Sequence, residues 1–117
     1  MPTILVVEDE PMIRSIAAEI LEDAGFKTIE ACNADEAIAI LKLGRHVQFV
    51  FTDINMPGSM DGAKLAFAIH ESWPPIHIVI TSGRGEPAVM PAQALFMSKP
   101  YTAKDVVAAM RSFQNMH

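Results

Sequence analysis

The sequence contains a single cysteine, Cys32, among 117 residues, so neither an internal disulfide nor a cluster of thiolate ligands can form. It also lacks any apolar stretch that approaches the length of a membrane-spanning helix. Its first residues contain neither a basic region nor a signal-cleavage site. We therefore expect a protein of the reducing cytoplasm without membrane insertion, in which Cys32 is a small buried residue.

Positive charge is scarce, because nine lysines and arginines oppose fourteen acids and leave a formal net charge of -5. This balance would repel a phosphate backbone unless the few bases gathered on one face, so we expect no direct binding of nucleic acid. A hydrophobic content of 50% with only 20% charged residues indicates a globular chain. The length suits one core, so a single domain over residues 1–117, with no output domain, is expected.

Short apolar runs alternate along the chain with segments of helical periodicity. Residues 3–7 (TILVV) form a β-branched run typical of a strand buried on both faces, and Ile13, Ile16 and Leu21 then recur at helical spacing. The other expected strands lie at 27–32, 47–52, 76–81 and 95–98. The expected helices begin at Pro11, Asn33, Ala63 and Thr102 and end near Gly25, Gly44, Glu71 and Phe113, with an irregular turn over 53–62. Strands that alternate with helices predict the α/β class with a doubly wound parallel sheet.

Polar side chains follow the expected strands at the points where they end. Glu8, Asp9 and Glu10 follow the first strand, Asp53 the third, Thr81, Ser82 and Gly83 the fourth, and Lys99 the fifth. Ligands bind at the carboxyl ends of the strands in such sheets, and these ends share one crevice. Carboxylates brought together there would repel one another unless a cation joined them, so the sequence predicts a site for a hard divalent cation.

The same residues favour chemistry on a phosphoryl group. Mg2+ takes one or two carboxylates together with water and phosphate oxygens, so Asp9, Asp53 and a backbone carbonyl would form an incomplete shell. An aspartate can attack phosphorus to form an acyl phosphate, and Lys99 and Ser82 offer a cation and a hydroxyl to the phosphoryl oxygens. The pattern therefore predicts Mg2+ as the cofactor of a phosphoryl acceptor.

Four motifs follow one another along the chain: ILVVEDEP, FTDINMP with a later DG, ITSG and SKPY. With these motifs the chain resembles the receiver domain of two-component response regulators over almost its whole length. The resemblance implies a flavodoxin-like sheet of five parallel strands in the order 2-1-3-4-5, with a cis peptide bond between Lys99 and Pro100. It also implies these roles: Asp53 as phosphoryl acceptor, Glu8 and Asp9 as the acidic metal pair, Asn55 as a metal ligand through its carbonyl, Lys99 as the phosphate contact, and Ser82 and Phe96 as the switch hydroxyl and aromatic.

The resemblance implies a regulatory protein that catalyses only its own phosphorylation and dephosphorylation. Asp53 would accept a phosphoryl group from a histidine kinase or phosphotransfer protein in a Mg2+-dependent step of a phosphorelay. The modified chain, a monomer or weak dimer, would then change its interaction with a downstream protein partner.

Other functions fit the residues less well. A phosphorylation-independent pseudo-receiver, acting as a protein-interaction module, is the alternative, although such proteins usually lack the acceptor, the acids or the lysine. A flavodoxin-like cofactor carrier would want Ser, Thr or Gly amides where this chain has Glu8 and Asp9. A magnesium-dependent phosphohydrolase would need a substrate pocket that 117 residues leave no room to build.

The chain departs from the receiver pattern between the fourth and fifth expected strands. Receivers usually have a full helix there, but residues 83–94 are few and include Pro87 and Pro91. A proline inside a helix removes a hydrogen bond and clashes with the preceding turn, at a cost of roughly 3 kcal/mol. We therefore expect the fourth helix of the family to be short or absent in this chain.

Overall fold

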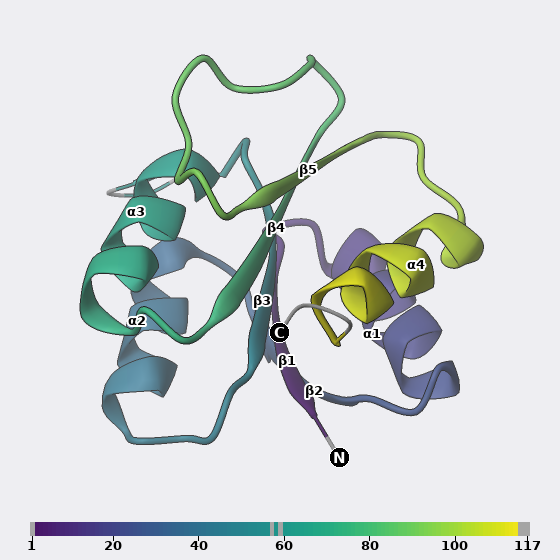
Figure 1. Ribbon diagram of the computed structural model, residues 1–117, viewed down its shortest axis with the longest axis horizontal. Helices are drawn as coiled ribbons and strands as arrows, with labels where there is room; N and C mark the ends of the chain where they lie inside the picture. The colour runs from purple at the N-terminus through teal and green to yellow at the C-terminus, as the bar shows by residue number, and fades with distance from the viewer. Residues whose placement is uncertain (1, 57, 59, 115–117) are drawn as a thin grey trace.

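The computed structural model describes residues 2–56, 58 and 60–114, and a five-stranded parallel sheet forms its centre (Figure 1). The strands are β1 (Thr3–Val7), β2 (Lys27–Ala31), β3 (Phe49–Asp53), β4 (His77–Ser82) and β5 (Leu95–Ser98). The helices are α1 (Pro11–Asp23), α2 (Ala34–Lys42), α3 (Gly62–Ser72) and α4 (Ala103–Gln114). The spatial order β2-β1-β3-β4-β5 confirms the predicted doubly wound α/β architecture.

The alternation of side chains along the strands divides the core into two layers. In β1, Ile4 and Val6 belong to the layer shared with α1 and α4, whereas Leu5 and Val7 belong to the layer shared with α2 and α3. Figure 1 shows α1 and α4 on one side of the sheet and α2 and α3 on the other. Because both faces are covered, β1 and β3 are buried along nearly their whole length, and their carboxyl ends are held in place.

Local sequence signals account for where the helices start. The Asn33 side chain accepts a hydrogen bond of 2.8 Å from the Glu36 N–H at the start of α2. At the start of α4, the Thr102 hydroxyl accepts from the Asp105 N–H, and the Asp105 carboxylate accepts from the Thr102 N–H. These pairs are the capping residues predicted from the sequence, and α1 likewise begins with the expected proline.

Several expectations about boundaries and burial change in the structure. Asp53 and Ser82 are the last residues of β3 and β4 and do not follow the strands, so the sheet itself holds their backbones. Ile13 and Ile16 are exposed although they continue the helical spacing of α1, and Cys32 is half-buried with its thiol donating to the Glu36 carboxylate. The turn expected over 53–62 includes Pro57 and Ser59, which lie outside the described residues.

The segment that connects β4 to β5 contains no helix, as the prolines predicted. Residues 83–94, all of them described, consist of bends and one turn, in which the Ala94 N–H donates to the Pro91 carbonyl. Pro91 and Ala94 are buried, so this end of the segment packs on the sheet. In Figure 1 the rest of the segment arches above the carboxyl ends of the strands. Residues 83–94 therefore lack the helix that receivers, which the sequence resembles, usually have there.

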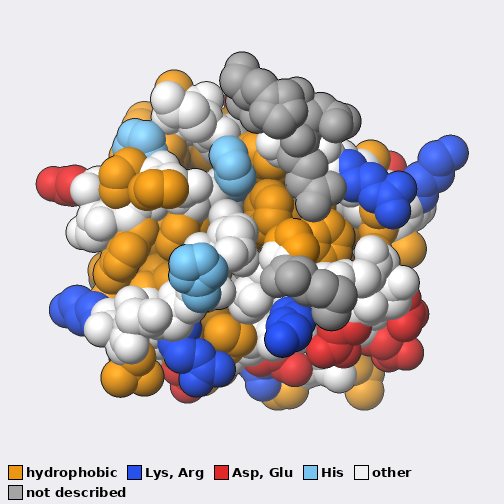
Figure 2. All heavy atoms as spheres, turned by 60° about the horizontal axis from the view of Figure 1, so that its bottom comes forward, with side chains coloured by type: hydrophobic (Ala, Val, Ile, Leu, Met, Phe, Trp, Pro, Cys, Tyr) orange, Lys and Arg blue, Asp and Glu red, His pale blue; other side chains and the backbone are white. Residues whose placement is uncertain are grey.

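The face of the molecule away from the carboxyl ends of the strands carries charged side chains of both signs (Figure 2). Figure 2 shows lysine and arginine side chains in several separate places on this face, with acidic side chains gathered near one side. Within the described part of the chain, none of the helices is at once long and apolar enough to cross a lipid bilayer.

Candidate functional site

Asp53 closes β3 at the carboxyl edge of the sheet, where only 7% of the residue is exposed. Its backbone pairs with Thr81 of β4, and the next N–H, that of Ile54, donates to the Thr81 carbonyl at 2.9 Å. One carboxylate oxygen, Oδ1, accepts a hydrogen bond of 3.3 Å from the Asn55 N–H. The other, Oδ2, lies 3.2 Å from the Nζ of Lys99. The carboxylate is thus buried and oriented by contacts to both of its oxygens.

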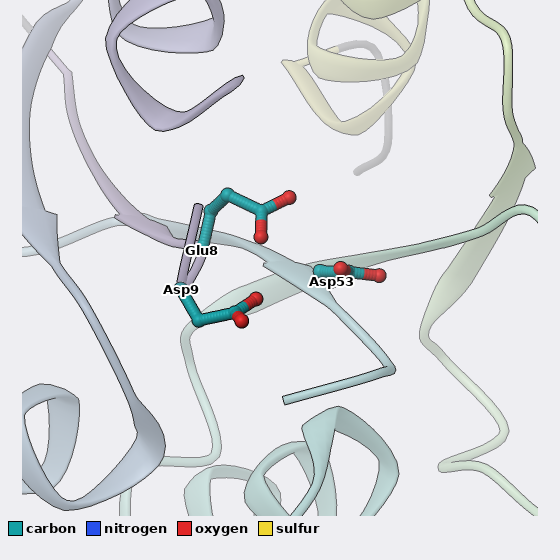
Figure 3. Close-up of side chains that lie close together, drawn as sticks. All are labelled: Glu8, Asp9 and Asp53. Carbon is teal, nitrogen blue, oxygen red and sulfur yellow. The ribbon is translucent and has the colours of Figure 1, made fainter. Parts of the chain in front are cut away.

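Glu8 and Asp9 bring two more carboxylates to Asp53, because β1 is the neighbour of β3 in the sheet. Ligand oxygens of the three side chains lie within 4.8 Å of one another, and Figure 3 shows Glu8 and Asp9 reaching toward Asp53. Glu8 is buried, with its Oε2 accepting from the Glu10 N–H at 3.2 Å, whereas Asp9 is exposed. The acidic pair predicted from the sequence therefore meets the predicted acceptor.

Lys99 supplies positive charge to the cluster from the end of β5. Its N–H donates to the Ser82 carbonyl at 2.8 Å, and its ammonium lies 3.2 Å from Asp53 and 3.4 Å from Glu8. Burial would lower the pKa of Lys99, but the carboxylates of Asp53 and Glu8 outweigh burial and hold this pKa above its ordinary value. Lys99 is therefore a fixed cation, and the expected cis peptide bond to Pro100 follows it.

The balance of charge in the cluster fits an additional cation. Burial raises the pKa of Glu8, and the hydrogen bond with Asp9 and the charge of Asp53 raise it further, while the Glu10 N–H and Lys99 oppose the shift only in part. The cluster thus holds three carboxylates, and the ammonium group of Lys99 pairs with two of them, those of Glu8 and Asp53. Oxygen donors at this spacing are the ligands that Mg2+ prefers, so the residues present suit Mg2+.

The other predicted site residues lie around this cluster. Ser82 is buried, and its hydroxyl accepts from the Arg84 N–H at 3.0 Å, whereas the neighbouring Thr81 hydroxyl points inward to the Thr52 carbonyl at 3.5 Å. Asn55 is exposed two residues after Asp53. Phe96 on β5 is half-buried and lies opposite Ile80 of β4. Asn55 is thus close to Asp53 in the chain, Ser82 lies beside Lys99 through the bond between their backbones, and Phe96 lies three residues before Lys99.

Two residues that support Asp53 were not singled out from the sequence. The Thr52 hydroxyl donates to the Asp53 carbonyl at 3.0 Å. Gly62, at the start of α3, donates its N–H to the Ile54 carbonyl, and a Cβ at this position would collide with the Asp53 carbonyl oxygen. The helix start can approach the acceptor strand only because residue 62 has no side chain. Gly62 belongs to the DG motif noted in the sequence, but the sequence does not show that this glycine lies against the backbone of Asp53.

Residues 4–111 match the sequence profile of the family described as "Response regulator receiver domain". The chain belongs to this family. Receiver domains are regulatory modules of two-component systems, so the acidic cluster, Asp53 and Lys99 belong to a signalling protein.

Similar proteins include parts of larger regulators. This chain is 33% identical over 115 residues to the sensor kinase CckA of Brucella abortus. The aligned region covers 93% of this chain and 12% of CckA. The chain is 36% identical over 110 residues to the nitrogen assimilation regulatory protein NtrX of Azorhizobium caulinodans, covering 89% of this chain and 24% of that protein. The chain therefore spans only a small part of the length of these relatives.

Solved structures share the fold closely. The receiver domain of NtrX from Brucella abortus superposes with a TM-score of 0.85 at 35% identity, covering 97% of this chain and 99% of that one. The response regulator TrrA from Thermotoga maritima, solved in complex with Mg2+ and BeF, has a TM-score of 0.87 at 25% identity and covers 96% of this chain and 98% of that one.

The close approach at Gly62 predicts an unusual effect of a glycine-to-alanine change. Alanine in place of glycine normally favours a helix by up to about 1 kcal/mol. Here the added Cβ would collide with the Asp53 backbone, so we expect Gly62→Ala to lower the free energy of unfolding by about 1–3 kcal/mol. Urea denaturation measures this change. Gly83→Ala is the matched control, since its Cβ would meet nothing nearer than Lys99 at 3.9 Å. Equal stabilities for the two variants would contradict the predicted contact.

The raised pKa of Glu8 predicts a stability that depends on pH in the absence of divalent cations. A raised pKa means that the folded state binds the Glu8 proton more tightly than the unfolded state does. The stability gained from this proton is complete below the ordinary glutamate pKa and is lost as pH rises through the pKa of Glu8 in the folded protein. We expect Glu8→Gln to raise the free energy of unfolding near pH 7.5 and to have little effect near pH 4. Urea denaturation in a chelating buffer tests this prediction, with exposed Glu71→Gln as the control. A Glu8→Gln effect that does not vary with pH would refute it.

Proposed function

We propose that Asp53 is the residue that accepts a phosphoryl group, from a histidine kinase or a phosphotransfer protein, in a Mg2+-dependent step. The observation that carries this proposal is the convergence of Glu8, Asp9 and Lys99 on the buried carboxylate of Asp53. A carboxylate in these surroundings has next to it both acids that can hold a cation and a fixed ammonium group. This is the arrangement that transfer of a phosphoryl group to an aspartate needs.

In the proposed step a carboxylate oxygen of Asp53 attacks phosphorus, and the bond from phosphorus to the donor's histidine nitrogen breaks. The electron pair of that bond leaves with the nitrogen, and Asp53 becomes an acyl phosphate. Lys99 lies 3.2 Å from Asp53 and would balance negative charge on the phosphoryl oxygens, and the Ser82 hydroxyl would supply a hydrogen bond. Hydrolysis of the acyl phosphate would complete the cycle, so the chain would catalyse only its own modification.

Glu8, Asp9 and Asp53 would hold Mg2+ through their carboxylates, with the Asn55 carbonyl as a further ligand. When bound, Mg2+ would neutralise charge that develops on the phosphoryl oxygens during transfer. The complex of TrrA with Mg2+ and BeF supports this assignment, because TrrA shares the fold of this chain. The oxygen donors of the cluster support it independently.

The donor protein would dock beside the site on an exposed apolar part of α1. Met12 is 72% exposed and Ile16 is 53% exposed, although both are large apolar side chains. Ile13 and Ile16 also line a hollow of ≈ 420 Å³ together with Lys99, Pro100 and Tyr101. A partner that covered this hollow would contact Lys99, the residue whose ammonium group lies 3.2 Å from Asp53.

Modification would change the interaction with a downstream partner through Ser82 and Phe96. Ser82 closes β4, and Phe96 lies on the neighbouring edge strand β5, which begins at Leu95, a residue that is 37% exposed. Movement of the Ser82 hydroxyl toward the phosphoryl group would therefore alter an exposed edge. The phosphorylation-independent alternative has less support, because the acids, the acceptor and the lysine are all present in one cluster.

Incubation with acetyl phosphate and Mg2+, followed by measurement of intact mass, tests the proposed acceptor. Wild type should gain the mass of one phosphoryl group, and this gain should disappear with a chelator or in Asp53→Asn, which lacks the nucleophilic oxygen. Asp23→Asn, at the exposed end of α1, is the control and should be modified like wild type. Lack of modification in wild type, or an unchanged adduct in Asp53→Asn, would refute the proposal.

A further inference from the structure

Arg14 lies within the first turns of α1 and reaches back toward the acidic turn that follows β1. Its Nη1 donates a hydrogen bond of 2.8 Å to the backbone carbonyl of Glu8, and its Nε lies 3.2 Å from the Oε1 of Glu30 on β2. The side chain is only 19% exposed. One guanidinium group therefore joins α1, the end of β1 and the end of β2.

This contact completes the bonding of the Glu8 backbone. The Glu8 N–H donates to the Ala31 carbonyl at 3.1 Å and continues the pairing of β1 with β2, while the Glu8 carbonyl is bonded to Arg14. The backbone is thus held on both sides at the residue where the chain leaves the sheet. Asp9 follows immediately, so the direction of its side chain depends on the same fixed peptide group.

We propose that Arg14 is a positioning residue for the cation site. It fixes the path of residues 8–10 so that the carboxylates of Glu8 and Asp9 converge on Asp53, and it acts through the backbone of Glu8 and not on the ion. The inference rests on the proposed function, because it takes these carboxylates to be the ligands of Mg2+. Groups that orient metal ligands typically contribute roughly 10- to 100-fold to metal affinity.

Simple electrostatics predicts the opposite effect from removal of Arg14. The guanidinium group carries a positive charge close to the acidic turn, so its removal would reduce repulsion of Mg2+ and tighten binding. Loss of positioning would weaken binding, because the two carboxylates would no longer be held in a converging arrangement. The sign of the change in Mg2+ affinity therefore distinguishes a positioning role from a purely electrostatic one.

The test is a Mg2+ titration of full-chain variants that is monitored by backbone-amide NMR. The temperature is one at which circular dichroism shows each variant folded. We expect Arg14→Gln to raise the dissociation constant for Mg2+ about 10-fold. Arg14→Lys should recover part of the affinity, because one ammonium group replaces a planar fork that serves two acceptors. Arg45→Gln is the control and should bind like wild type, since Arg45 lies beside Thr3 and Lys27 at the opposite end of the sheet.

Unchanged or tighter Mg2+ binding in Arg14→Gln, alongside binding by wild type, would overturn the inference and leave the proposed function standing. Failure of wild type to bind Mg2+ would overturn both. If Arg14→Gln does not fold, Arg14→Lys decides the matter, because it keeps the positive charge and removes the planar fork that serves two acceptors. Weaker Mg2+ binding in Arg14→Lys than in wild type supports the positioning role, and binding equal to wild type overturns it.

Discussion

Repulsion among three carboxylates at one edge of the sheet is the constraint on which the site depends. One oxygen each of Glu8, Asp9 and Asp53 lie within 4.8 Å of one another, and two unit charges at that upper limit interact by roughly 3–4 kcal/mol at an effective dielectric constant near 20. Lys99 opposes this repulsion from a position 91 residues after Glu8 in the chain. The folded protein therefore contains a site that is stabilised by any cation it binds, and binding of a cation is coupled to stability.

The fold makes this arrangement by backbone geometry. Because β1 and β3 are neighbours, the acidic turn and Asp53 leave the sheet side by side, and pairing of β4 with β5 brings Lys99 next to Ser82. The two apolar layers hold these strand ends, and the bare backbone of Gly62 allows α3 to start against the acceptor. Side chains that carry the chemistry thus project from positions that the core fixes.

Much of this arrangement was predictable, because it follows from local patterns in the sequence. Apolar runs and capping pairs such as Thr102 with Asp105 located the elements, and acids after strands located the site. The contacts of Gly62 and Arg14 could not be predicted, since both depend on how closely distant backbones approach. The exposure of Ile16 was also missed, because helical spacing shows which residues share a face but not what covers that face. The functional roles of the site residues all remain predictions: Asp53, Glu8, Asp9, Asn55, Lys99, Ser82 and Phe96.

The most direct test of the central claim is the gain in the free energy of unfolding when Mg2+ is added to two double variants. Asp9→Asn/Asp53→Asn removes two charges of the cluster, and Glu19→Gln/Asp23→Asn removes two charges from the exposed part of α1. We expect Mg2+ to stabilise wild type and the α1 double variant equally, and to leave the site double variant unchanged. Equal stabilisation of both double variants by Mg2+ would contradict a cation site formed by the converging carboxylates.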